Sequence, residues 1–376
     1  MPKVLLLCEY PSLNGGERSM LATLGGVRSA GFSIAAAAPP EGPLADALLA
    51  QGVEVLPFEA HDPARERRPQ RRLRELLSRL LAQARPDLLH ANSLSMGRLS
   101  GPVAAGLGVP GVAHLRDIIK LSARAVVDLN RHTRLLAVSQ ATGRFHVAQG
   151  VAAEKTLVLH NGVDLDRFRP RARTGYLHQE LGLASGSPLV GTIGQIGLRK
   201  GQDVLLRAAA VVAGEFPDVH YVLVGQRWSD KAESRQFEAE LHVASRGRLA
   251  GRLHFLGVRN DVERILHELT LLAHPARQEP LGRVLLEAAA SGTPVVATDV
   301  GGTREIFPPD REAARLVCPD DHRELAAAIL EVLGDEPLRL RMASAARRRA
   351  EEAFGAARAA AALVGHYRQV LTAGSH

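Results

Sequence analysis

Short apolar runs alternate with helix-like segments along the whole chain. A first series of runs occupies residues 4–8, 34–37, 53–58, 88–91, 112–115, 135–138 and 156–160. A second series occupies residues 189–193, 220–224, 253–256, 271–273, 295–297 and 316–318. Runs of this length, separated by helices, are typical of parallel strands that are buried on both faces of a sheet. The pattern predicts an α/β protein with two doubly wound sheets.

The alternation is interrupted between residues 168 and 188, where Arg-Pro-Arg and Ala-Ser-Gly-Ser-Pro are linker and turn signals. We predict two Rossmann-like domains, over residues 1–170 and 171–352, and a final helix over 353–376. Residues 336–371 are helical in character, with a break at Gly355, and are long enough to return to the first domain. Ligands bind at the carboxyl ends of parallel strands, so we expect the site in a cleft between the two sheets.

The string E-P-L-G-R-V-L-L-E over residues 279–287 carries the most specific chemistry. Its Pro and Gly predict a turn that opens a helix after the run at 271–273. Leu281 and Gly282 would then offer backbone N–H groups to an anion. Glu279 and Glu287 would accept hydrogen bonds from sugar or ribose hydroxyls. The alternative is an exposed Glu before an ordinary amphipathic helix.

Two further loops suit a phosphate. Gly15 and Gly16 follow the first run and let the backbone approach an anion closely, although a plain tight turn would have the same residues. Arg199 and Lys200 precede Gly201 at a predicted helix start. Two cations there can neutralise a diphosphate leaving group, and the alternative is a basic surface turn.

His114 lies near the end of the run at 112–115, and Arg116 and Asp117 follow that run. At a strand end we interpret His114 as a ligand contact rather than a structural histidine. Arg116 and Asp117 either pair with each other or contact the acceptor.

Together these motifs resemble the retaining glycosyltransferases of the glycogen-synthase-like kind, family four. The string at 279–287 is similar to the E-x7-E signature of that family. Other segments similar to family motifs are 14–17 (G-G-x-E loop), 86–92 (P-D strand ending in H-x-N), 160–170 (N-G-V-D hinge), 194–201 (G-x5-K-G loop) and 301–305 (G-G-x-x-E). The resemblance covers nearly the whole chain.

The resemblance implies a GT-B fold, with the final helix crossing back to the first domain. It implies transfer of a hexosyl group, with retention, from a UDP- or GDP-sugar to a hydroxyl of a sugar, lipid-linked or small-molecule acceptor. Cell-wall or polysaccharide biosynthesis is the expected setting. The residues implied are, for catalysis, Glu279, Lys200, Arg199 and His114; for the donor, Gly15, Gly16, Gly257, Val258, Leu281, Gly282 and Glu287; and for the acceptor, Asn92, Arg116 and Asp117.

The chain departs from the family pattern at two positions. Gln195 stands where the family has Arg, so either Arg199 takes over that charge or the role is lost. Arg227 stands where the family often has Gly after Val224-Gly225, which weakens any inference about the nucleotide base.

Asp164-Leu165-Asp166 has the D-x-D form of a metal site, but it lies inside the hinge motif rather than in an acidic cluster. No other carboxylate grouping suggests Mg²⁺, and Arg199 and Lys200 would supply the positive charge. We therefore expect no metal and no cofactor.

The net charge of +7 and the pI near 9.9 suggest an anionic partner. Aromatic residues make up only 4%, which argues against nucleic acid. Residues 65–85 predict a basic amphipathic helix, with leucines at 73, 76, 77, 80 and 81 and arginines at 65, 67, 68, 71, 72, 74, 79 and 85. We expect the leucines to pack on the sheet and the arginines to be solvated, with contact to an anionic lipid surface as the alternative.

No run approaches the roughly 18 apolar residues of a membrane span, and the first run is too short for a signal peptide. We expect a cytoplasmic protein, with peripheral contact at the inner membrane face as the alternative. Cys8 and Cys318 lie far apart in apolar runs, and we interpret both as buried thiols.

Two other functions fit the same architecture. A sugar-nucleotide 2-epimerase would convert the donor alone into an epimer, and the E-x7-E string argues against it. A catalytically silent sugar-nucleotide-binding partner subunit would not hydrolyse the donor. The nucleotide, sugar, acceptor, linkage and oligomeric state are left open by the sequence.

Overall fold

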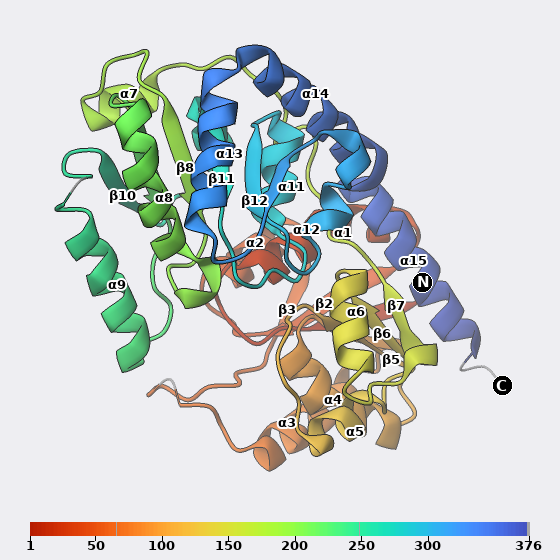
Figure 1. The fold of residues 1–376 in the computed structure, drawn as a ribbon. Helices are drawn as coiled ribbons and strands as arrows, with labels where there is room; N and C mark the ends of the chain where they lie inside the picture. Colours follow the sequence, from red (N-terminus) through yellow and green to blue (C-terminus); the bar gives the residue numbers. More distant parts are fainter. Residues whose placement is uncertain (65, 248, 374–376) are drawn as a thin grey trace. The chain divides into compact units, whose positions relative to one another are not determined.

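The computed structural model describes residues 1–64, 66–247 and 249–373 (Figure 1). Arg65 of the basic segment lies outside the described residues. The chain forms two compact units: unit 1 is Met1–Gly162 with Gly355–His376, and unit 2 is Val163–Phe354. The divisions predicted from the sequence, after residues 170 and 352, lie eight and two residues from these.

The described residues of unit 1 form a seven-stranded parallel sheet in the order β3-β2-β1-β4-β5-β6-β7. Each of the first seven apolar runs forms one of its strands, as predicted. The strands are β1 (Lys3–Leu7), β2 (Ser33–Ala38), β3 (Glu54–Pro57), β4 (Leu88–Ala91), β5 (Gly111–Leu115), β6 (Arg134–Ala137) and β7 (Thr156–Val158).

Helices cover both faces of this sheet because alternate side chains of a strand point to opposite faces. Val4 and Leu6 pack with α1, α2 and α15, whereas Leu5 and Leu7 pack with α3, α4 and α5. The helices are α1 (Gly15–Ser29), α2 (Pro43–Ala50), α3 (Gln70–Ala84), α4 (Leu94–Gly106), α5 (Ala123–Leu129), α6 (Gln140–Val147) and α15 (Ala356–Ala373).

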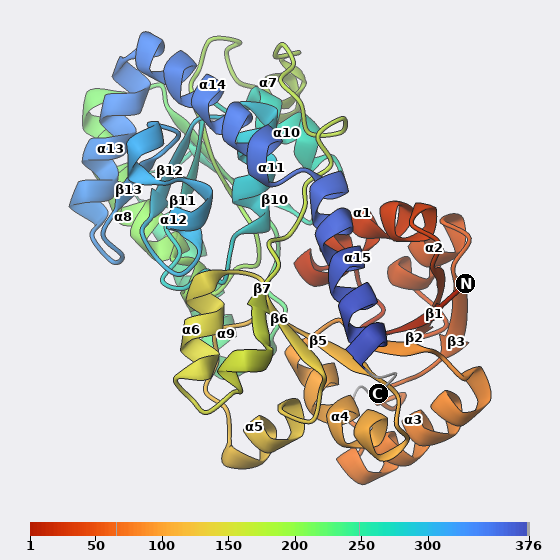
Figure 2. The same ribbon diagram turned by 90° about the vertical axis from the view of Figure 1, so that its right-hand side faces the viewer.

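Helix α15 joins unit 1 from the far end of the sequence and lies beside α1 (Figure 2). The start of α15 packs directly against the backbone at Gly162. A side chain does not fit there, because a Cβ on Gly162 would lie 2.7 Å from Cα of Ala356. Leu363, Val364, Tyr367 and Val370 of α15 are buried in the core of unit 1.

The described residues of unit 2 form a six-stranded parallel sheet in the order β10-β9-β8-β11-β12-β13. All six runs of the second series form these strands. They are β8 (Leu189–Ile193), β9 (His220–Val224), β10 (Leu253–Gly257), β11 (Leu271–His274), β12 (Val295–Thr298) and β13 (Arg315–Val317).

The main core of unit 2 lies between this sheet and helices α8, α9, α13 and α14. The two-sheet α/β architecture predicted from the pattern is therefore confirmed. The helices are α7 (Tyr176–Leu181), α8 (Gln202–Glu215), α9 (Ala232–Ala244), α10 (Val262–Glu268), α11 (Arg283–Ser291), α12 (Thr303–Ile306), α13 (His322–Gly334) and α14 (Glu336–Ala353).

The basic segment forms α3 from Gln70, and its leucines behave as predicted. Leu73, Leu77 and Leu81 are buried against the sheet, with Leu76 and Leu80 partly buried beside them. The packed amphipathic helix is therefore confirmed.

The prediction for the cysteines is half right. Cys8 is buried, but Cys318 is exposed. The edge strand β13 ends at Val317, so Cys318 lies past its end. Its backbone N–H donates to the Glu324 carboxylate at 2.8 Å.

A search of the described residues finds no helix that is both long enough and apolar enough to span a bilayer.

Candidate active site

In unit 2, glycines end three neighbouring strands. Gly194, Gly225 and Gly257 follow or end β8, β9 and β10, and all have positive φ, at 148°, 137° and 62°. A Cβ on Gly225 would lie 1.9 Å from the carbonyl oxygen of Gly194, so no side chain fits there. The carboxyl edge of the sheet thus presents bare backbone, which a ligand can approach closely. Val258, predicted at the donor site, follows Gly257 and is 57% exposed.

Lys200 and Glu279 form a buried ion pair next to these glycines. The Lys200 Nζ lies 2.5 Å from Oε2 of Glu279, and the two side chains are only 14% and 7% exposed. A Cβ on Gly194 would lie 3.7 Å from Cε of Lys200. The structure therefore brings together two residues that the sequence analysis placed in one site from motifs 79 positions apart.

His274 is the third member of this cluster. Its Nε2 lies 2.8 Å from the same Oε2 of Glu279. Within the described chain no hydrogen bond reaches the other oxygen, Oε1, which is left to accept a hydrogen bond from a ligand. His274 was not among the predicted site residues, although it directly follows the predicted strand at 271–273.

The cluster has a defined charge state. Burial alone would raise the pKa of Glu279, but Lys200 and His274 outweigh it and hold that pKa below its ordinary range. Burial lowers the pKa of His274, so its ring is neutral, and it lowers the pKa of Lys200 as well. A carboxylate only accepts hydrogen bonds, so the proton of His274 is on Nε2. Because the pKa of Glu279 is lowered by folding, the stability that the pair contributes is lost only as the pH falls through that lowered value.

Two glycines of the G-G-x-x-E segment hold the backbone of Glu279. The N–H of Gly302 donates to the carbonyl oxygen of Glu279 at 3.0 Å. A Cβ on Gly301 would lie 1.8 Å from that oxygen, and Gly301 has a φ of 53°. This segment therefore has a structural role in placing the Glu279 carboxylate.

Helix α11 begins directly after this carboxylate. Gly282 precedes the first helical residue with a φ of 101°, and Leu281 is buried. The first N–H groups of a helix have no partner within it and carry partial positive charge, which suits an anion. One turn further on, Glu287 is 7% exposed and lies 2.8 Å from Nε of Arg283. The predicted ribose contact is therefore an ion-paired carboxylate.

The loop that carries Arg199 and Lys200 is fixed by Arg277. The Arg277 N–H donates to the carbonyl oxygen of Arg199 at 2.9 Å, and its guanidinium binds Asp203 at 2.8 Å. The Arg199 side chain is exposed and reaches the carbonyl oxygen of Gln278 at 3.3 Å. Gln195 is also exposed. Which of Arg199 and Gln195 carries the expected role stays a prediction.

Arg227 does not lie open to a base. Its guanidinium donates to Glu238 at 2.9 Å and to Asp230 at 2.6 Å, which attaches the loop after β9 to helix α9.

In unit 1, the predicted acceptor residues meet at the ends of β4 and β5. Arg116 donates to the carbonyl oxygen of Asn92 at 2.9 Å, to Oδ1 of Asn92 at 3.0 Å and to Oδ1 of Asn161 at 2.7 Å. A Cβ on Gly16 would lie 3.1 Å from Cδ of Arg116, so the Gly15-Gly16 loop packs against the same guanidinium. Asp117 is exposed, and its carbonyl oxygen accepts from His146 at 2.7 Å.

His114 is buried and hydrogen-bonded. Its Nδ1 lies 2.7 Å from Nε2 of His90 and 3.2 Å from Nη2 of Arg116. The Nδ1 of His90 in turn lies 2.5 Å from the hydroxyl of Tyr367. His114 was predicted from the sequence as a site residue, whereas His90 and Tyr367 were not.

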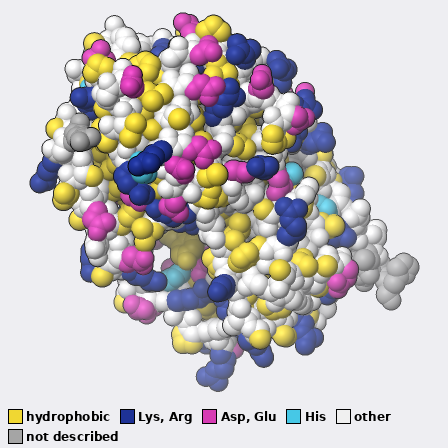
Figure 3. All heavy atoms as spheres, viewed as in Figure 1, with side chains coloured by type: hydrophobic (Ala, Val, Ile, Leu, Met, Phe, Trp, Pro, Cys, Tyr) yellow, Lys and Arg dark blue, Asp and Glu magenta, His cyan; other side chains and the backbone are white. Residues whose placement is uncertain are grey.

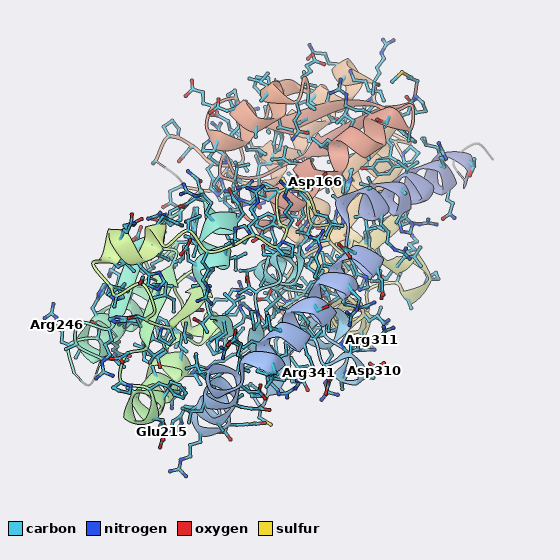
Figure 4. All side chains as sticks on the ribbon, turned by 90° about the horizontal axis from the view of Figure 1, so that it is seen from above. Asp166, Glu215, Arg246, Asp310, Arg311 and Arg341 are labelled. Atoms are coloured by element: carbon cyan, nitrogen blue, oxygen red, sulfur yellow. The ribbon has the colours of Figure 1, made fainter. Side chains whose placement is uncertain are left out.

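The D-x-D sequence of the hinge makes a turn. Asp164 accepts from the N–H groups of Asp166 and Arg167, each at 3.0 Å. Asp166 is exposed; its position is labelled in Figure 4. Among the described residues no group of three or more His, Cys, Asp or Glu side chains is arranged to hold a metal ion.

Family models match both halves of the chain. Residues 176–349 match the model described as glycosyl transferases group 1, and residues 13–167 match glycosyltransferase family 4.

Two similar proteins are named as mannosyltransferases. The chain is 31% identical to a lipopolysaccharide core biosynthesis mannosyltransferase of Rhizobium meliloti over 61% of its own length and 68% of that protein. It is 29% identical to a phosphatidyl-myo-inositol mannosyltransferase of Mycolicibacterium smegmatis over 90% of its length and 86% of that protein. Other relatives are matched over 68% to 32% of their length.

Among solved structures, Anabaena HepE in complex with UDP and glucose has a TM-score of 0.86 and 25% identity, covering 98% of this chain and 100% of that one.

Proposed function

The chain belongs to the group 1 glycosyltransferases and has their GT-B fold, and from this premise we propose that it transfers a hexosyl group from a nucleoside-diphosphate sugar to a hydroxyl acceptor with retention. One observation carries the proposal. The Lys200–Glu279–His274 cluster lies beside the start of α11 and the glycine-lined ends of β8 and β9.

The positive groups of this cluster suit a departing diphosphate. The Lys200 ammonium has three hydrogens, and one of them is used by Glu279. The others, with the N–H groups at the start of α11 and the exposed Arg199, can bind phosphate oxygens as negative charge grows on them. Because these groups are already in place, little reorganisation is needed in the transition state.

The negative group suits the sugar. Glu279 uses Oε2 for both Lys200 and His274, so Oε1 can accept hydrogen bonds from sugar hydroxyls. The same contacts keep the carboxylate ionised and fixed. We assign it to holding the sugar and name no carboxylate nucleophile; the leaving phosphate itself would take the proton of the acceptor hydroxyl.

The relatives support a donor of this class. Two similar proteins are mannosyltransferases of lipopolysaccharide and phosphatidyl-myo-inositol, and HepE was crystallised with UDP and glucose. We therefore propose a UDP- or GDP-hexose as the donor and a sugar, lipid-linked or small-molecule acceptor, in polysaccharide or cell-wall synthesis.

A thermal-shift screen tests the proposal. The wild-type chain is heated with UDP, GDP, ADP and dTDP and with their hexose derivatives. At 100 times its Kd, the true donor should stabilise the folded chain by about 2.7 kcal/mol. A sugar nucleotide that also yields a transferred product with retained configuration supports the assignment. No response to any of these nucleotides would refute it.

We also propose that the transfer needs no metal ion, since Lys200 and Arg199 supply the charge that Mg²⁺ supplies elsewhere. Transfer rates measured in excess EDTA and in millimolar Mg²⁺ should agree within about twofold. Loss of turnover in EDTA, restored by Mg²⁺, would contradict this part of the proposal.

The exposed arginines of α3 suggest contact with an anionic lipid surface. Arg71 is 94% exposed, and it borders an open groove of about 730 Å³ with Arg79 and Arg124. Arg74 is not available, because it binds Asp128 at 2.7 Å. In Figure 3 basic side chains, dark blue, are scattered over the viewed face among hydrophobic and acidic ones. Such charges contribute roughly 1 kcal/mol each near an anionic membrane.

Charge reversal tests this contact. The triple variant Arg71→Glu, Arg72→Glu, Arg79→Glu should lose more than about 100-fold in affinity for phosphatidylglycerol-containing vesicles in a sedimentation assay. The matched control reverses Arg246, Arg311 and Arg341, which point away from the ribbon of unit 2 in Figure 4. Equal loss in both triples would show that only net charge matters.

A further inference from the structure

Three buried side chains of unit 1 form a continuous hydrogen-bonded chain. It runs from the Tyr367 hydroxyl on α15 to His90 on β4, at 2.5 Å, and from His90 to His114 on β5, at 2.7 Å. Tyr367 and His90 are each 1% exposed, whereas His114 is 4% exposed. The chain therefore begins in the core and ends at its most exposed member, His114.

Strand register explains how the two imidazoles meet. His90 lies opposite Val112 in the parallel pair β4–β5, and His114 follows two residues later. Side chains two residues apart share one face of a sheet, so both rings point to the face that α15 covers. Tyr367 reaches this face from a segment that is 277 residues away in sequence.

Arg116 sets the direction of every hydrogen bond in the chain. A guanidinium only donates, so the Nδ1 of His114, 3.2 Å from Arg116, must accept and carries no proton. The Nε2 of His90 points at the same Nδ1 and must therefore donate, so the Arg116 and His90 donors share the single lone pair of that nitrogen.

The remaining proton positions follow. Burial lowers the pKa of His90 to about 3, so its ring is neutral and its Nδ1 accepts from the Tyr367 hydroxyl. Burial also lowers the pKa of His114, whose single proton must then lie on Nε2. In the described chain no other group bonds to that nitrogen.

We propose that Tyr367 and His90 are positioning residues that hold His114 as the Nε2–H tautomer, so that His114 presents a fixed N–H donor to an oxygen of the bound substrate. This inference rests on the proposed function, because it takes His114 to be a ligand contact. It assigns His114 the role of a hydrogen-bond donor and excludes the role of a general base. Tyr367 and His90 touch no substrate and act through the ring of His114.

Two variants at residue 90 distinguish the effect of the hydrogen-bonded chain on activity from the effect of side-chain packing. His90→Gln places an amide N–H near Nδ1 of His114 and an amide oxygen near Tyr367, so the direction of the chain is kept. His90→Phe fills similar space and donates nothing. We expect His90→Phe to lower kcat/KM by about tenfold or more and His90→Gln to stay within about threefold of wild type. Tyr367→Phe should fall between them.

The tautomer is measured without substrate. In the ¹⁵N spectrum of the histidine-labelled chain, His114 should show a protonated Nε2 and a non-protonated Nδ1, and His90→Phe should shift this towards a mixture. A His114 protonated on Nδ1 in the wild type would overturn the proposal. Equal activity of His90→Phe and wild type, or equal loss in His90→Gln and His90→Phe, would also overturn it. If no sugar nucleotide binds the wild type, the proposed function fails, while the spectrum still decides the tautomer.

Discussion

Replacing Lys200 with Ala should lower kcat for sugar transfer by about 10²- to 10³-fold, the usual loss when a preorganised charge at a leaving group is removed. Lys200 is the buried cation of the site, and it faces the glycine-lined strand ends. Negative charge on the diphosphate grows during the reaction, so kcat should fall more than KM rises. Steady-state kinetics with the donor identified in the thermal-shift screen measure both.

The control for this variant is Lys231→Ala, an exposed lysine of the same unit. It should leave both constants unchanged. Lys200→Ala also leaves Glu279 without its cation, and we expect roughly 1–3 kcal/mol of destabilisation from that loss. Near-normal turnover in a folded Lys200→Ala protein would remove Lys200 from the mechanism.

Replacing Glu279 with Gln should lower transfer by about 10²-fold. The amide keeps the shape of the side chain but removes the charge that fixes Lys200 and orders His274. It also weakens the acceptor for sugar hydroxyls at Oε1. We expect the variant to bind the free nucleoside diphosphate still, but to lose the extra affinity for the nucleotide sugar.

This pattern separates Glu279 from Lys200, since Lys200→Ala should weaken binding of both the diphosphate and the sugar nucleotide. Isothermal titration with each ligand distinguishes the two outcomes. Glu233→Gln, an exposed glutamate on α9, is the matched control. If Glu279→Gln binds the sugar nucleotide as tightly as the wild type does, our assignment of Glu279 to the sugar is wrong.

The strands could be predicted from the sequence because each buried strand is a short run of apolar residues. Each of the thirteen runs forms a strand, and most bounds differ by one or two residues. Cys318 shows where this reasoning fails. An apolar run predicts a strand, but only the three-dimensional arrangement decides that β13 is at the sheet edge and that residue 318 lies beyond it.

The sequence motifs predicted that Lys200 and Glu279 belong to one site, and the two side chains form an ion pair in the structure. The binding of both Lys200 and His274 to one oxygen of Glu279 could not be predicted, because it depends on side-chain direction. The pairing of Arg283 with Glu287 could have been foreseen from their i, i+4 spacing in a helix.

Contacts between residues far apart in the sequence could not be predicted, because no local pattern connects the two residues. Tyr367 lies on a helix whose sequence shows only Ala, Leu and Arg periodicity, and nothing local connects it with His90. In a single sequence, a contact between residues 90 and 367 has no local signature. The role of Gly301 was likewise hidden, because the clash that a Cβ would make is with the backbone of Glu279, 22 positions earlier.

The composition of unit 1 from two distant segments has a consequence for synthesis on the ribosome. All of unit 2 is synthesised before α15. Until then, the surface of the first sheet that Leu363, Tyr367 and Val370 cover in the folded protein stays exposed. A fragment ending at residue 162 would keep that apolar surface open to water, and it should aggregate when expressed alone. Fusing residues 355–373 to such a fragment through a flexible linker is the way to obtain the first half of this protein as an independent domain.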